Sequence, residues 1–99
     1  MAKKQGGLTM EFTREKEAFV HRNANGQLLA EITWITLDEH TWEANHTFVD
    51  PSLRGQGVAK QLVDTLVDVA RSEHKKIKPT CPYIVKLFEK DTSYSDVAV

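Results

Sequence analysis

A short turn with two glycines, Arg54-Gly55-Gln56-Gly57, comes directly before a run of residues with helical periodicity. The first turn of an α-helix has N–H groups without a carbonyl partner and carries a partial positive charge. Glycines at such a place let an anion approach the backbone closely, because no Cβ intervenes. These residue types at this spacing therefore predict an anion site, for a phosphate or a pyrophosphate.

Two common phosphate-binding loops do not fit this turn. The Walker A loop ends in Gly-Lys-Ser/Thr, whereas Val58-Ala59-Lys60 follow Gly57 in this chain. The dinucleotide-binding fingerprint requires a third glycine at the place of Lys60. On the turn alone, a glycine turn that binds no ligand remains the alternative to an anion site.

The strands that must position this turn follow from the alternation of apolar residues. A first short strand is expected around Phe12 and a second over 18–20, and an Asn-Gly turn joins the second to a strand over 28–35. A fourth strand is expected over 42–49. Strict alternation along it places four side chains on one face: Trp42, Ala44, His46 and Phe48.

The clearest helix begins at the end of the glycine turn. Apolar residues recur at spacings of three and four up to Ala70, so the helix has one apolar face and ends near 72–73. A fifth strand over 77–81 and a short helix over 83–90, opened by Pro82, follow. The predicted fold is α/β of the α+β kind, with one long amphipathic helix after the fourth strand and a short C-terminal helix.

Composition limits the classes of function. The chain has 99 residues, of which 40% are hydrophobic and 27% charged, which predicts one compact domain over 10–99 after a flexible tail over 1–9. A net charge of -1 argues against nucleic acid, and the absence of a run of ~20 apolar residues argues against a membrane span. The four histidines show no metal-ligand spacing. A single cysteine, Cys81, excludes an intramolecular disulfide and favours the cytoplasm.

The segment from Val49 to Ala59 resembles the acetyl-CoA-binding motif of the GCN5-related N-acetyltransferases (GNAT), Arg/Gln-x-x-Gly-x-Gly/Ala. Arg54, Gly57 and Ala59 occupy its defining positions. The flanking segments 46–49 and 79–83 resemble a compact branch of short, single-domain members, and the likeness covers roughly 12–90. It implies a mixed, mostly antiparallel sheet and acetyl-CoA as the cosubstrate.

The resemblance also implies where coenzyme A lies. Backbone N–H groups at the helix start should hold the pyrophosphate, and Arg54 should contact a phosphate or fix the loop. The strands that hold Val49 and Ile77 should separate to leave a slot for the thioester, with the pantetheine arm paired to the main chain near Phe48 and Val49. The expected cofactor-binding residues are Phe48, Val49, Arg54, Gly55, Gln56, Gly57, Val58, Ala59 and Lys60.

Acyl transfer to an amine needs a base for the ammonium proton and an acid for the leaving thiol. Many family members use a glutamate on the fourth strand and a tyrosine in the last helix, whereas this chain has Asn45 and Phe88 at the positions that we align with them. His46 is the best local replacement for the base, since histidine exchanges protons near neutral pH; a hydrogen-bonded core histidine is the alternative. Cys81 is expected to relay the acyl group or protonate the thiolate, unless it is only a small buried residue.

These features predict an acetyl-CoA-dependent N-acetyltransferase, or alternatively a non-catalytic acyl-CoA-binding module. The short chain leaves few residues for an acceptor pocket. That favours an open site for a small-molecule or protein amine, or a site shared across a homodimer. Glu43 and Tyr83 are secondary candidates for proton transfer. A basic cluster after the long helix either contacts the 3′-phosphate of the nucleotide or, as we favour, is only solvated (Arg71, His74, Lys75, Lys76 and Lys78).

Overall fold

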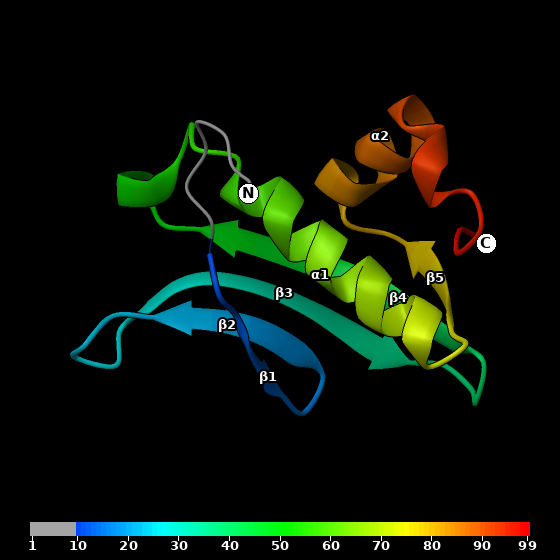
Figure 1. Ribbon diagram of the computed structural model, residues 1–99, viewed down its shortest axis with the longest axis horizontal. Coiled ribbons are helices and arrows are strands. Elements are labelled where there is room, and N and C mark those ends of the chain that lie inside the picture. The colour runs from blue at the N-terminus through cyan, green and yellow to red at the C-terminus, as the bar shows by residue number, and fades with distance from the viewer. Residues whose placement is uncertain (1–9) are drawn as a thin grey trace, which may run out of the picture.

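The computed structural model describes residues 10–99, so the tail expected over 1–9 lies outside the described residues. A long helix lies across a twisted sheet, and a shorter helix lies near the C-terminal end of the chain (Figure 1). The elements in chain order are β1 (Thr13–Glu15), β2 (Ala18–Arg22), β3 (Leu28–Thr36), β4 (Thr41–Val49), the 3-10 turn η1 (Pro51–Leu53), α1 (Val58–Ser72), β5 (Lys76–Pro79), α2 (Pro82–Lys90) and the 3-10 turn η2 (Thr92–Tyr94).

The five strands form one sheet in the order β1-β2-β3-β4-β5. Each of the first four strands is antiparallel to its neighbour, and β5 pairs in parallel with β4. A parallel pair needs a crossover connection, which α1 provides. The predicted fold class, a mostly antiparallel mixed sheet with one long helix after the fourth strand, is confirmed.

The turn between β2 and β3 is the predicted Asn-Gly turn. Gly26 has φ 83°, in the left-handed region that glycine tolerates best. The side-chain oxygen of Asn23 accepts the N–H groups of Asn25 (2.9 Å) and Gln27 (3.0 Å), which fixes the loop. This turn lies at the end of the β2–β3 hairpin, and Gly26 has nearly the same φ as the two glycines before α1.

A β-bulge changes the faces of β4. Ala44 pairs with Trp34 and His46 pairs with Thr33, which are consecutive residues of β3. Asn45 is therefore an extra residue in β4, without a partner in the ladder. One extra residue reverses the side chains beyond it. Ala44 is fully buried, whereas the side chain of His46 is 54% exposed on the face opposite α1. The strict alternation predicted for this strand is therefore wrong beyond the bulge.

The core lies between the sheet and the helices. Trp34 stacks on Trp42 with ring centroids 4.8 Å apart, and Phe19 packs on Trp34 at 5.7 Å. The apolar face of α1 covers these rings, as the spacing of its residues predicts. Its buried residues are Val58, Leu62, Val63, Leu66, Val67 and Ala70.

The last residues return to the sheet, which the sequence pattern did not predict. The N–H of Ile77 in β5 donates to the carbonyl of Val97 (2.6 Å), and the N–H of Val99 donates to the carbonyl of Ile77 (3.0 Å). Ala98 forms a parallel bridge with Ile77. The C-terminal segment therefore lies beside β5.

Candidate active site

The turn before α1 has the conformation that its glycines predict. Gly55 has φ 80° and Gly57 has φ 76°, and a Cβ built on either residue would find no atom within 4 Å. Backbone conformation, not space, therefore demands glycine. Gly57 is the N-cap of α1, no side chain caps this terminus, and the first turn holds no acidic residue. The free N–H groups and the helix dipole are thus left available for an anion.

A pocket of about 150 Å³ opens at this helix terminus. This volume is below the ~300–1,000 Å³ of pockets that enclose a whole small-molecule ligand, so the pocket suits one phosphate-bearing part of a larger molecule. Leu53 and Tyr83 contribute to it in addition to the residues expected from the motif, and burial raises the pKa of Tyr83. The lining residues are Val49, Leu53, Arg54, Gly55, Gly57, Val58, Ala59, Lys60 and Tyr83.

Arg54 fixes the loop that leads into the pocket. Its Nε donates to the carbonyl of Val49 at 3.0 Å. The carboxylate of Asp50 accepts the N–H (3.0 Å) and the hydroxyl (2.6 Å) of Ser52, which caps η1. These contacts tie the end of β4 to the start of the glycine turn. Of the two roles expected for Arg54, contacting a phosphate or fixing the loop, the hydrogen bond to Val49 supports the second.

The strands β4 and β5 separate next to this loop. Their pairing ends at Ala44 and Pro79, while β4 continues to Val49. The five residues beyond Ala44 have no partner in β5 among the described residues. The amides of Thr80 (3.0 Å) and Cys81 (3.2 Å) both donate to the Ala44 carbonyl, which marks where the strands part. The expected separation of the two strands is therefore present, and it leaves this edge of β4 without a strand partner among the described residues.

The register of β4 decides which backbone groups face this slot. The N–H of Asp50 donates to the carbonyl of Leu29 in β3 (2.8 Å), so the Val49 carbonyl across the same planar peptide points away from β3. Along a strand, the residues that face one neighbour alternate, so Thr47 and Val49 face the slot and Phe48 faces β3. Any contact of Phe48 with a ligand must therefore come from its side chain. Thr47 is the residue that sequence reasoning missed, because its orientation depends on the bulge.

Cys81 lies at the inner end of the slot. Its thiol is buried at the N-terminus of α2, 3.5 Å from the hydroxyl of Thr47. Burial raises the pKa of the Cys81 thiol, but the hydroxyl of Thr47 and the nearby N–H groups of Ile84 and Tyr83 lower it by more. The pKa is therefore lower than that of an ordinary cysteine, which favours the reactive thiolate.

His46 and Cys81 approach the slot from different faces. Cys81 contacts Thr47, whose side chain is on the α1 face, whereas His46 lies on the opposite face with Nε2 3.7 Å from a carboxylate oxygen of Glu31. The alternative of a buried core histidine is wrong, because His46 is exposed. Glu43 accepts a hydrogen bond from the hydroxyl of Thr80 (2.9 Å), near the end of the β4–β5 pairing.

The basic residues after α1 lie at the other end of the helix. A helix of 15 residues is about 22 Å long, so this cluster is remote from the pocket at Gly57. The ammonium of Lys75 contacts the carbonyl of Glu39, and that of Lys76 contacts the carbonyl of Asp96. Within residues 10–99, no group of side chains is arranged to hold a metal ion, and no helix has the length and apolar character needed to cross a membrane.

The described residues fit a long ligand with an anionic group at one end. The uncapped helix N-terminus matches a phosphate, and the adjacent open edge of β4 matches an extended chain with amide groups. The inner end of this edge meets a cysteine and a histidine, which suit acyl transfer. An acyl-coenzyme A has this sequence of chemical groups.

Comparison with known proteins shows the family. The profile described as GCN5-related N-acetyl-transferase matches residues 17–97. The solution structure of a GCN5-like protein from Staphylococcus aureus is 34% identical, with a TM-score of 0.77, and the match covers 90% of this chain and 87% of that one. The chain belongs to the GCN5-related N-acetyltransferase family. No curated protein sequence matches it.

Two larger structures share the fold. A Mycobacterium tuberculosis protein in complex with CoA is 25% identical with a TM-score of 0.51, and the match covers 62% of this chain and 39% of that one. A ribosomal-protein-alanine N-acetyltransferase from Brucella melitensis is 26% identical with a TM-score of 0.56, covering 83% and 62%. The chain is accordingly an acetyl-CoA-dependent N-acetyltransferase.

Proposed function

We propose that the chain transfers an acetyl group from acetyl-CoA to an amine, with the diphosphate bound at the N-terminus of α1. The observation that carries this assignment is the uncapped, acid-free helix terminus that opens into a pocket beside the unpaired edge of β4. The N–H groups from Gln56 to Lys60 bind the diphosphate, and the left-handed Gly57 directs them toward the pocket.

The pantetheine arm lies along the open edge of β4. The backbone of Thr47 and Val49 faces this edge, and Arg54 holds the carbonyl of Val49. Five strand residues span about 16 Å, so an extended arm that starts at the pocket ends near Ala44 and Cys81. The thioester is thereby placed beside the buried thiol.

The reaction breaks the bond between the acetyl carbon and sulfur and forms a carbon–nitrogen bond. The amine must lose a proton to become nucleophilic, and the departing sulfur must gain one. We assign the proton acceptor to His46, which an amine arriving from the face opposite α1 would meet, with Glu31 orienting the imidazole. Cys81 either donates the proton to the departing thiolate or carries the acetyl group between two transfers.

The setting and partners are also proposals. A buried free cysteine is compatible with a reducing compartment, so we place the chain in the cytoplasm. The acceptor is an amine on a small molecule or on a protein tail, since an amine can reach the exposed side chain of His46 from the face of the sheet opposite α1. A homodimer would complete the acceptor site from a second copy.

The test measures amine-dependent release of CoA from acetyl-CoA over a panel of small amines, peptide α-amines and lysine peptides. Gly57→Glu puts a negative charge into the pocket, and Gly26→Glu is the matched control with the same positive φ in a remote turn. We expect wild type and Gly26→Glu to bind CoA and transfer acetyl, and Gly57→Glu to lose both.

Unchanged CoA binding by Gly57→Glu would contradict the proposed cosubstrate site. Tight CoA binding by wild type with no transfer to any amine would instead indicate a non-catalytic acyl-CoA-binding module. Mass spectrometry after incubation with acetyl-CoA alone separates the two roles of Cys81, because only the relay leaves an acetyl adduct on the thiol. Cys81→Ala and His46→Gln then test the two proton-transfer assignments separately.

A further inference from the structure

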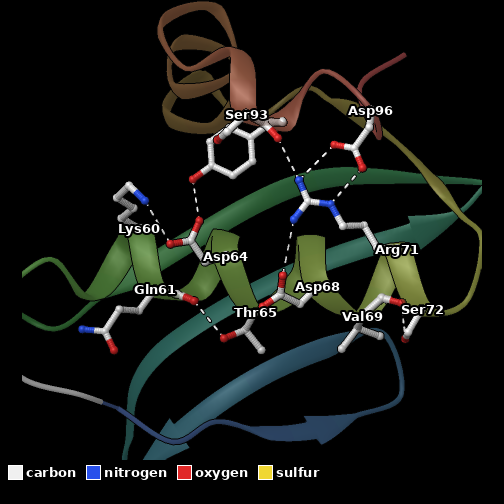
Figure 2. A network of polar contacts seen from close by, with 11 residues as sticks. Lys60, Gln61, Asp64, Thr65, Asp68, Val69, Arg71, Ser72, Ser93 and Asp96 are labelled. Atoms are coloured by element: carbon white, nitrogen blue, oxygen red, sulfur yellow. Dashed lines mark hydrogen bonds and ion pairs between the residues drawn. The ribbon is translucent and has the colours of Figure 1, made fainter. Parts of the chain in front are cut away.

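The charged side chain of Lys60 lies at the pocket and forms an ion pair with Asp64. It belongs to the first turn of α1 and lines the pocket. Its ammonium lies 3.0 Å from one carboxylate oxygen of Asp64, one helical turn further on (Figure 2). An ammonium has three N–H donors, so this contact leaves two for a ligand.

The other oxygen of Asp64 is held from outside the helix. The hydroxyl of Tyr94 donates to it, and the Tyr94 ring centroid lies 5.9 Å from the ammonium of Lys60. Tyr94 is only 3% exposed, and burial followed by the contact with Asp64 raises its pKa to about 12. The hydroxyl therefore remains a proton donor over the whole physiological range.

The segment that carries Tyr94 is itself anchored. The guanidinium of Arg71 holds the carboxylate of Asp96 through two contacts of 2.9 Å and donates to the carbonyl of Ser93 at 2.8 Å (Figure 2). The Tyr94 ring stacks on Phe88 of α2 with centroids 5.0 Å apart. These contacts hold Tyr94 against the first two turns of α1, although Tyr94 follows Asp64 by 30 residues in the sequence.

We propose that Tyr94, acting through Asp64, is a positioning residue that holds the ammonium of Lys60 at the pocket mouth for the diphosphate of acetyl-CoA. The inference rests on the proposed cosubstrate site. A free lysine loses rotamer entropy when it contacts a ligand, whereas a side chain that is already held loses less.

A double-mutant cycle on ligand binding tests this role. The variants are Lys60→Met, Tyr94→Phe and the double variant, and the dissociation constants of CoA and dephospho-CoA are measured by calorimetry. We expect Lys60→Met to weaken both ligands about tenfold, as for loss of a charge-assisted contact. Tyr94→Phe keeps the ring and its stacking, and we expect it to weaken binding about threefold in wild type and not at all in the Lys60→Met background.

Two further readouts separate positioning from a general structural effect. Tyr94→Phe should raise KM for acetyl-CoA and leave kcat unchanged, and Lys75→Met, which removes a remote lysine, should leave CoA affinity unchanged. Equal losses from Tyr94→Phe in both backgrounds, or no loss in wild type, would overturn the positioning role. If Lys60→Met weakened the binding of CoA but not of dephospho-CoA, Lys60 would contact the 3′-phosphate, and the diphosphate assignment would be overturned. Failure of wild type to bind CoA would overturn the proposed function itself.

Discussion

The hydroxyl of Thr47 lies 3.5 Å from the thiol sulfur of Cys81, joining the last part of β4 to the start of α2. The contact closes the inner end of the slot at the place where β4 and β5 stop pairing. It exists because the bulge at Asn45 turns Thr47 toward the α1 side of the sheet. One irregularity of the strand therefore determines both the shape of the slot and the environment of its only thiol.

The first prediction concerns ionisation of this thiol. The hydroxyl of Thr47 and the N–H groups at the start of α2 favour the thiolate and lower the pKa of Cys81 despite burial. We expect a spectroscopic thiolate titration to have its midpoint below that of an unfolded cysteine, and Thr47→Val to move it upward. Thr47→Ser retains the hydroxyl and serves as the control, and Cys81→Ser gives the baseline.

The sign of the linked stability follows from this direction. A depressed pKa contributes stability that is present above the unfolded-state pKa and is lost as the pH falls through the folded-state value. Thr47→Val should therefore lower stability mainly at alkaline pH. A midpoint above that of unfolded cysteine in wild type would show that burial dominates instead.

A second prediction separates the geometry of Arg54 from its charge. Arg54→Lys keeps a positive charge but removes the Nε that donates to the carbonyl of Val49. We expect KM for acetyl-CoA to rise about threefold, since one hydrogen bond that orders the loop is lost. Arg22→Lys is the control, because its guanidinium also donates to a carbonyl, that of Gly26 (3.4 Å), but in the remote hairpin. An unchanged KM would assign Arg54 a role through charge alone.

A third prediction concerns the core beneath the site. Leu62 is 0% exposed and lies one turn inside α1, so Leu62→Ala leaves a cavity and should lower the free energy of unfolding by about 2–5 kcal/mol. Leu37 is 47% exposed, and Leu37→Ala should change it by less than ~0.5 kcal/mol. Urea unfolding measures both variants. Equal effects would place Leu62 outside a tightly packed core.

A fourth prediction concerns the C-terminal segment. Arg71→Met removes the contacts to Asp96 and should speed hydrogen exchange of the Ile77 and Val99 amides, which pair across the same segment. Arg14→Met removes another exposed ion pair near the end of α1, with Glu73, but leaves that segment untouched. Amide exchange followed by NMR should therefore change only in the first variant. Similar rates in both would show that the backbone pairing alone holds the segment.

Local patterns predicted the elements well, because each pattern is contained in its own segment. The apolar periodicity starting at Val58 predicted α1 to within a residue or two of its end, and Pro82 marked the start of α2. The bulge at Asn45 could not be predicted in this way, since it depends on how β4 pairs with β3. It reversed the expected orientation of His46, which is consequently exposed.

The same distinction applies to the site. The anion-binding turn could be predicted, because two glycines directly before an amphipathic helix indicate a left-handed turn from the local sequence alone. The position of Tyr94 could not, since it depends on contacts between Arg71 and a segment 22 to 25 residues further along. The segment's own composition, rich in Ser, Thr and Asp, favours turns and does not reveal which helix it covers.

The unpaired edge of β4 has a consequence for association between copies of the chain. Open strand edges attract other strands and lead to aggregation. In the described part of the sheet, β1 exposes only three residues and Ala98 bridges Ile77 beyond β5, so the five residues after Ala44 form the longest open ladder. A pantetheine arm on that ladder would occupy it. The cosubstrate should thus act as a solubilising cap, and light scattering at rising temperature should show later aggregation with CoA present than without it.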